Sequence, residues 1–167
     1  ATLVSWLDAG APALAQEPLS PALQTELAAW EQFLNGDDNK SRLMARYVYE
    51  HLFLATLYLQ ADDRPRWFRL VRSATPPGEP IDLLTPRRPF DDPGRKTFFY
   101  RLQAMPIIVA AKSHQPYRFD AERRAWYQSL FLTPDYAVAK VPGYDENTAG
   151  NPFTTFAALP VRSRYRF

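Results

Sequence analysis

Apolar residues recur at helical spacing in the first third of the chain. Residues 1–10 end in a glycine and predict the last turns of a helix. Ser20 can accept a backbone hydrogen bond as a helix cap, and Pro21 suits the first helical position, where its missing N–H has no partner to lose. The helix that follows has one apolar stripe, formed by Leu23, Leu27, Trp30 and Leu34. The Asn-Gly pair after this stripe is expected to end the helix.

A second helix is predicted from about Lys40 to Gln60, and its apolar residues lie on more than one face. A helix of this kind is expected to be buried, because a single apolar stripe suffices for a helix with one solvated face. Glu50 and His51 are therefore expected in or beside the core, where each needs a partner. Arg46 precedes Glu50 by four residues, a spacing that allows an ion pair on one helix face.

Beyond residue 65 the period of the pattern changes from helical to alternating. Residues 66–73 predict a strand with Phe68, Leu70 and Arg72 on one face. Three prolines keep residues 79–89 extended or only briefly strand-like. Further strands are predicted at 97–102, 106–111 and 136–141, a helix capped by Asp120 at 121–130, and one helical turn at 153–158.

The pattern as a whole predicts an α+β fold. N-terminal helices are followed by a small mixed or antiparallel sheet with one further helix. We divide the chain into a helical segment, residues 1–62, and a mixed segment, residues 63–167. Because both ends look like the middle of an element, we expect the chain to be one piece of a longer polypeptide.

Composition narrows the possible chemistry. Of the 20 basic residues 16 are Arg and 4 are Lys, and the net charge of +2 is too small to indicate nucleic-acid binding. The share of proline is roughly twice the average, which favours stiff loops. The chain has no cysteine, so it can form no disulfide, thiolate metal site or covalent haem attachment. No apolar run approaches the ~18 residues of a membrane span.

Few residues suggest a catalytic site. The two histidines, His51 and His114, have no second metal ligand at helical spacing, so we predict no metal site. His51 beside Glu50 fits a structural role better than a catalytic one, whereas His114 follows a predicted strand, a common place for functional residues. Half of the arginines lie between Arg64 and Arg101 among aromatic residues. This cluster fits internal ion pairing, contact with lipid headgroups or, less well because of nearby acids, nucleic-acid binding.

Five runs, taken in order, resemble the bacterial fatty acid cis/trans isomerases. They are RYVYEHLFLATLYL from Arg46, WFRLVRSATPPGEPI from Trp67, TPRRPFDDPG from Thr85, KSHQPY from Lys112 and NPFTTFAALPVRSRYRF from Asn151. The resemblance implies a periplasmic enzyme that converts cis double bonds of unsaturated fatty acids in membrane lipids to trans without moving them, as a membrane adaptation. It also implies a haem c, which must be attached outside this segment because the Cys-x-x-Cys-His motif is missing. Ala111 stands where an additional histidine of the family is expected.

On this basis we predict His51, His114 and Glu50 as catalytic residues, with the segment inactive alone. As residues that bind substrate we predict Arg72, Arg87, Arg88 and Tyr117. The expected partners are unsaturated fatty acids or phospholipids, the rest of the parent chain and, peripherally, a membrane, but no nucleic acid. The alternative is a non-catalytic lipid-binding or scaffold domain of a larger periplasmic protein, in which these side chains only hold the fold.

Overall fold

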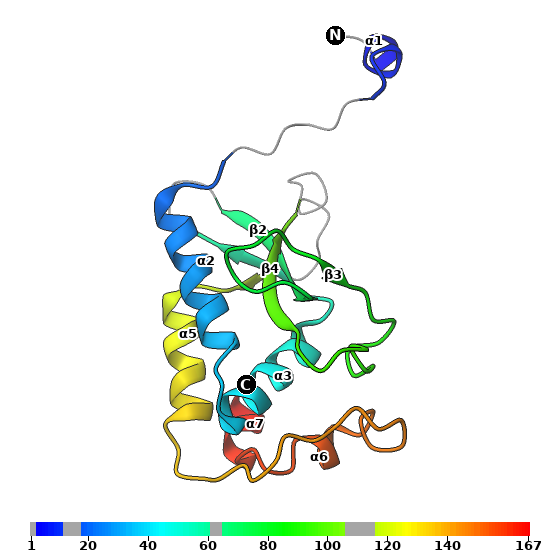
Figure 1. The fold of residues 1–167 in the computed structure, drawn as a ribbon. Helices are drawn as coiled ribbons and strands as arrows, with labels where there is room; N and C mark the ends of the chain where they lie inside the picture. Colours follow the sequence, from blue (N-terminus) through cyan, green and yellow to red (C-terminus); the bar gives the residue numbers. More distant parts are fainter. Residues whose placement is uncertain (1–2, 12–17, 61–64, 106–115) are drawn as a thin grey trace.

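The computed structural model describes residues 3–11, 18–60, 65–105 and 116–167, and confirms an α+β fold (Figure 1). The helices are α1 (Leu3–Asp8), α2 (Pro21–Leu34), α3 (Asn39–Leu52), α5 (Ala121–Tyr127), the π-helical η1 (Gln128–Leu132), α6 (Pro152–Thr155) and α7 (Val161–Arg166). The strands are β1 (Thr56–Leu59), β2 (Arg66–Ser73), β3 (Leu83–Leu84), β4 (Phe99–Ala104) and β5 (Pro116–Arg118).

Strand β2 is the centre of the mixed sheet. It pairs antiparallel with β4 along one edge, from Phe68↔Ala104 to Ser73↔Phe99. Along its other edge it pairs antiparallel with β1 near its start and with β3 near its end. Strand β1 pairs in parallel with β5. Phe68 and Leu70 are buried with Arg72 on one face of β2, as the alternation predicted.

The starts of α2 and α3 form as their sequences predict. The N–H of Leu23 donates to Ser20 Oγ at 3.3 Å, and the N–H of Ser41 donates to Asp38 Oδ1 at 2.9 Å. Hydrogen bonds from Ser41 lower the pKa of Asp38, because they stabilise its carboxylate. Gly36 separates the two helices, and a Cβ there would lie 2.7 Å from Ser41 Cβ, so the turn excludes a side chain.

The prediction of one helix to residue 60 is wrong, because α3 ends at Leu52 and residues 56–59 form β1. Leu57 pairs with Phe68 on one side and with Tyr117 on the other. A short apolar run can form a helix or a strand. Residues 56–59 form a strand because they pair with β2 and β5. Tyr58 and Thr56 suit that choice, since aromatic and β-branched residues favour strands.

The prediction of a strand at residues 136–141 is also wrong, because this stretch is irregular. Its carbonyl groups are bound by a side chain of α3: Asn39 Nδ2 donates to the carbonyls of Val138 and Ala139, at 3.1 Å each. The strand predicted at 106–111 lies outside the described residues. The helix predicted at 121–130 is α5 continued by η1, the strand predicted at 97–102 is β4, and the helical turn predicted at 153–158 is α6.

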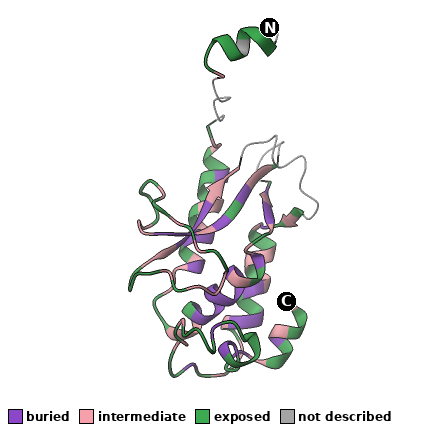
Figure 2. Ribbon diagram, turned by 90° about the vertical axis from the view of Figure 1, so that its right-hand side faces the viewer, coloured by how far each residue is buried: buried purple, intermediate pink, exposed green. Residues whose placement is uncertain are grey.

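One hydrophobic core draws on both predicted segments. Trp30 of α2 is fully buried and stacks on Phe119, with ring centroids 3.5 Å apart. Helices α2 and α5 lie side by side and are joined by an ion pair between Glu26 and Arg124 (Figure 1). Buried residues run along α3 and the strands, whereas α1 is exposed where its side chains are described (Figure 2). No described helix has the length and apolar character needed to cross a membrane.

Side chains of α2 bind the outer edge of β4. The N–H of Tyr100 donates to Asn35 Oδ1 at 2.9 Å, and Asn35 Nδ2 donates back to the carbonyl of Tyr100 at 2.8 Å. The N–H of Leu102 donates to Glu31 Oε1 at 3.0 Å. No strand among the described residues pairs with this edge, and these bonds satisfy backbone groups of Tyr100 and Leu102 that would otherwise be open to pairing with another chain.

Asn35→Ala is expected to lower the free energy of unfolding by about 2 kcal/mol, because the backbone groups of Tyr100 lose both partners on the α2 side. Gln32→Ala, at an exposed position of the same helix, is the control and is expected to cost less than about 0.5 kcal/mol. Urea unfolding of the three proteins measures both changes. Equal midpoints for Asn35→Ala and the wild type would contradict this role of Asn35.

A cationic pocket between α3 and β4

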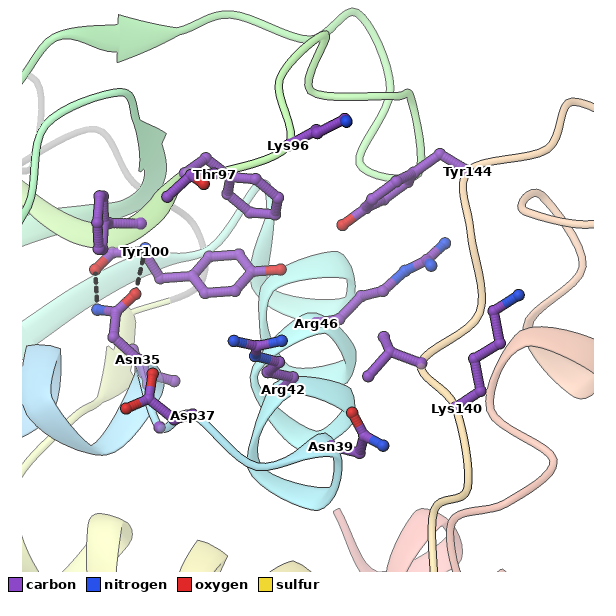
Figure 3. A pocket seen from close by; sticks show the side chains of 15 residues that line it. Asn35, Asp37, Asn39, Arg42, Arg46, Lys96, Thr97, Tyr100, Lys140 and Tyr144 are labelled. Carbon is purple, nitrogen blue, oxygen red and sulfur yellow. Dashed lines mark hydrogen bonds between the residues drawn. The ribbon is translucent and has the colours of Figure 1, made fainter.

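A pocket of about 480 Å³ opens between the first half of α3 and the chain leading into β4 (Figure 3). We call it the α3–β4 pocket. The residues that line it are Leu34, Asn35, Gly36, Asp37, Asn39, Arg42, Arg46, Lys96, Thr97, Phe98, Phe99, Tyr100, Lys140, Val141 and Tyr144. Its volume lies within the range of sites for small molecules, and four of its residues are aromatic.

Basic side chains outnumber acidic ones in the α3–β4 pocket. Arg42 and Arg46 come from α3, Lys96 from the loop before β4, and Lys140 from the segment 140–144 (Figure 3). Asp37 is the acidic residue of the lining. With four basic residues and one acidic residue in its lining, the pocket attracts anions.

Arg46 is a structural cation at the wall of the pocket. Its side chain is 1% exposed, and its Nε donates to Glu50 Oε1 at 2.7 Å. Its Nη1 donates to the carbonyls of Pro142 at 2.7 Å and Gly143 at 2.9 Å, which holds the segment 140–144 against α3. Its Nη2 is buried and has no hydrogen-bond partner among the described residues.

Tyr144 lies between two buried guanidinium groups. Its ring centroid is 4.0 Å from Cζ of Arg46 and 4.9 Å from Cζ of Arg72. Arg72 is fully buried, and its Nη1 and Nη2 donate to the carbonyls of Asp91 at 2.8 Å and Pro89 at 3.0 Å. Cations over ring faces are stabilised by the ring quadrupole, so this stack fixes one wall of the pocket.

Burial changes the acidity of the groups around this stack. It raises the pKa of Tyr49, whose ring lies 4.4 Å from Cζ of Arg72, to about 12. Burial and then the neighbouring Tyr144 raise the pKa of Tyr100 well above its ordinary value. Burial also raises the pKa of Glu50, although the hydrogen bond and charge of Arg46 act in the opposite direction. Tyr49 and Tyr100 therefore keep their protons to a higher pH than exposed tyrosines do.

The predicted ion pair between Arg46 and Glu50 is confirmed, and His51 lies beside the core, against the ring of the buried Tyr47, although it is exposed and not inside the core. His51 occupies the last turn of α3 and is exposed, because the helix ends one residue later instead of running on through the core. Its Nδ1 lies 2.8 Å from the carbonyl oxygen of Tyr47, and its ring lies 4.0 Å from the Tyr47 ring. A carbonyl only accepts, so Nδ1 carries a proton and donates it to this hydrogen bond.

Three of the residues predicted to bind substrate, Arg72, Arg87 and Arg88, lie around the loop of residues 87–91, whereas Tyr117 lies elsewhere. Arg72 is buried behind the pocket wall and donates its hydrogen bonds within the protein. Arg88 is exposed and pairs with Asp91 at 2.8 Å, and Arg87 is exposed beside it. The hydroxyl of Tyr117 is bonded to that of Tyr127 at 2.8 Å, on β5 and α5. His114 lies outside the described residues.

Sequence reasoning missed Arg42, Lys96, Lys140 and Tyr144. One signal was present, since Arg42 and Arg46 are four residues apart and therefore share a face of α3. Nothing local connects this face with Lys96 or Lys140, which come from irregular stretches far along the chain. Within the described residues, no three His, Asp or Glu side chains gather as a metal site would need.

Arg72→Lys is expected to lower the free energy of unfolding by about 2 kcal/mol, because one ammonium cannot span both carbonyls and stack on the rings. Arg88→Lys, in the loop that Arg72 binds, is the matched control. The Arg88 side chain is 62% exposed, so the free energy of unfolding is expected to fall by about 0.5 kcal/mol or less. Denaturant unfolding measures the two effects, and a loss as small for Arg72→Lys as for Arg88→Lys contradicts the structural role.

Stability is expected to fall as the pH rises from 10 toward 12, because Tyr49 keeps its proton in the folded chain after the unfolded chain has released it. The folded pKa is the higher one, so this contribution is complete below pH 10 and is lost above it. Tyr49→Phe keeps the ring over Arg72 and is expected to flatten this fall. Thermal unfolding followed across alkaline pH tests this, with the exposed Tyr165→Phe as control; equal slopes for the two variants refute the assignment to Tyr49.

Comparison with known proteins places the chain in a family. The model of the family "Fatty acid cis/trans isomerase (CTI)" matches residues 1–167. Comparison with curated proteins finds no match, and comparison with solved structures finds none either. Since the match spans all 167 residues, the chain belongs to the fatty acid cis/trans isomerase family.

Proposed function

We propose that this chain is part of a periplasmic enzyme that converts cis double bonds of unsaturated fatty acids in membrane lipids to trans, without moving the double bond. The observation that carries the proposal is the family match over residues 1–167. The geometry supports it, because the α3–β4 pocket combines four aromatic residues with a cationic lining. An amphiphile complements both features, because its acyl chain can pack on the aromatic rings and its anionic head can pair with the basic side chains.

The reaction needs a temporary loss of double-bond character, since a C=C bond does not rotate at a useful rate at ordinary temperature. A haem c attached elsewhere in the parent protein would supply electron withdrawal from the double bond. The described residues supply binding and orientation. Phe98, Phe99 and Tyr144 offer apolar faces to an acyl chain, and the bonds of Arg46 and Arg72 hold these faces in place before the substrate arrives.

His51 has the chemistry of a residue that could approach the haem iron. Its Nδ1–H donates to the carbonyl of Tyr47, which orients the ring and makes Nε2 the nitrogen that could serve as a ligand. It is exposed, so the rest of the parent chain could reach it. With no cysteine in the chain, covalent attachment of the haem belongs to another segment. We keep His51, Glu50 and His114 as proposed catalytic residues.

The alternative, a non-catalytic lipid-binding or scaffold domain, is favoured by one set of contacts. Glu50 is engaged by Arg46, and Arg72 holds a loop by two carbonyls, so both residues have structural roles. Under this alternative, the parent protein would keep its activity when His51 and His114 are replaced. Unsaturated fatty acids or phospholipids, a peripheral membrane contact and the rest of the parent chain are the proposed partners in either case, with no nucleic acid.

The parent enzyme expressed in a bacterium without this activity is expected to raise the trans fraction of its unsaturated fatty acids, with the double bond at its original position. His51→Ala and His114→Ala are each expected to lower that fraction at least about tenfold. Gas chromatography of the membrane lipids measures both results. Leu54→Ala, at a position 90% exposed and three residues after His51, is the matched control and is expected to be fully active.

Two results would count against the proposal. Absence of trans fatty acids in cells that contain the folded parent enzyme would refute the isomerase function. Wild-type activity in both histidine variants would remove these residues from the mechanism and leave the function standing.

A further inference from the structure

Three basic side chains of the α3–β4 pocket are not engaged by the protein. Arg42, Lys96 and Lys140 are exposed and form no ion pair or side-chain hydrogen bond within the part of the chain that the structure describes. They come from three separate stretches of chain, and all three line the α3–β4 pocket (Figure 3). Like charges that the fold brings together repel each other, and an anion between them relieves the repulsion.

Other arginines of this protein already have partners. Arg101 pairs with Glu31 at 2.9 Å, and Arg88 pairs with Asp91 at 2.8 Å. Arg118 pairs with Asp120, and Arg124 with Glu26. Arg42, Lys96 and Lys140 have no such partner among the described residues, and they share the lining of the pocket with the buried Arg46, whose Nη2 is a donor without a partner there as well.

The pocket offers more than charge. Phe98 and Phe99 line it and are half-buried, and the Tyr144 ring covers Arg46 at 4.0 Å. An inorganic ion would use the cations alone, whereas an acyl-chain amphiphile would also cover these rings. Burial of apolar surface is favourable, so the rings favour a ligand with an apolar chain attached to its charged group.

We propose that the α3–β4 pocket binds the oxyanion head, phosphate or carboxylate, of an acyl-chain amphiphile, and that Arg42, Lys96 and Lys140 hold it. The acyl-chain part of this inference rests on the proposed function. The anion-binding part rests on the charges of the pocket alone. These residues replace Arg72 and Arg88, whose guanidinium groups are bonded to the protein, as the groups that meet the head.

The test is equilibrium binding to the purified 167-residue chain by calorimetry, with dodecyl phosphate, dodecanoate, dodecanol and inorganic phosphate as separate probes below any micelle concentration. The two anionic amphiphiles are expected to bind more weakly as salt rises, because exposed charges are screened. Tighter binding of dodecyl phosphate assigns the site to a phospholipid head, and tighter binding of dodecanoate assigns it to a free fatty acid. Dodecanol and inorganic phosphate are each expected to bind at least about tenfold more weakly.

The decisive variant is the triple substitution Arg42→Gln, Lys96→Gln and Lys140→Gln. It is expected to weaken binding of the preferred amphiphile at least about tenfold. The control removes three other exposed arginines, through Arg69→Gln, Arg162→Gln and Arg166→Gln, and so changes the net charge equally. It is expected to change binding by less than about twofold.

Equal binding by the wild type and the pocket variant, or an equal loss in the control, overturns the inference. So does binding of dodecanol as tight as that of the two anions. These outcomes are independent of the isomerase function. The parent enzyme's trans-fatty-acid production, measured separately, can fail while the pocket binds anions, or succeed while the pocket variant binds them unchanged.

Discussion

Buried guanidinium groups that donate to loop carbonyls hold this structure together. Arg46 binds the carbonyls of Pro142 and Gly143, and Arg72 binds those of Pro89 and Asp91. Arg101 binds the carbonyls of Pro76 at 2.5 Å and Glu79 at 3.0 Å. Proline contributes a carbonyl but no N–H, so a proline-rich loop has acceptors to spare and few donors. The planar arginine fork supplies several donors from one side chain.

This arrangement accounts for the unusual composition of the chain. Prolines such as Pro76, Pro89 and Pro142 stiffen loops whose carbonyls accept from buried arginines, and the surplus of Arg over Lys supplies the forks that are buried there. The charge costs free energy to bury, and two of the three groups offset this with a carboxylate, Glu50 for Arg46 and Glu31 for Arg101. Arg72 is instead surrounded by the rings of Tyr49, Phe98 and Tyr144.

The same contacts separate structural cations from available ones. Arg46 fixes the segment 140–144, and Arg72 fixes the loop before β4, so two of the segments that line the α3–β4 pocket are held before any ligand arrives. The side chains of Asn35 and Glu31 add to this by binding the outer edge of β4. Arg42, Lys96 and Lys140 line the same pocket but are exposed, so water solvates their charges. Membership of the fatty acid cis/trans isomerase family is the reason why we propose an acyl-chain amphiphile as the ligand of this pocket.

The sequence by itself determined features that depend on short-range interactions. These are the helix caps at Ser20 and Asp38, the alternation of buried residues in β2 and the ion pair of Arg46 with Glu50. Each of these depends on residues a few positions apart. The sequence by itself also placed the chain among the fatty acid cis/trans isomerases, through five ordered runs that the family match confirms.

Only the tertiary structure decided where α3 ends, because β1 exists through pairing with two strands that lie farther along the chain. It also decided which arginines are buried and which remain free. The periodicity of the sequence shows which residues share one face of a helix or strand. Whether that face is buried depends on which other segments of the chain pack against it. The pocket is the clearest case, since Arg42, Lys96 and Lys140 share no pattern in sequence and meet only in the fold.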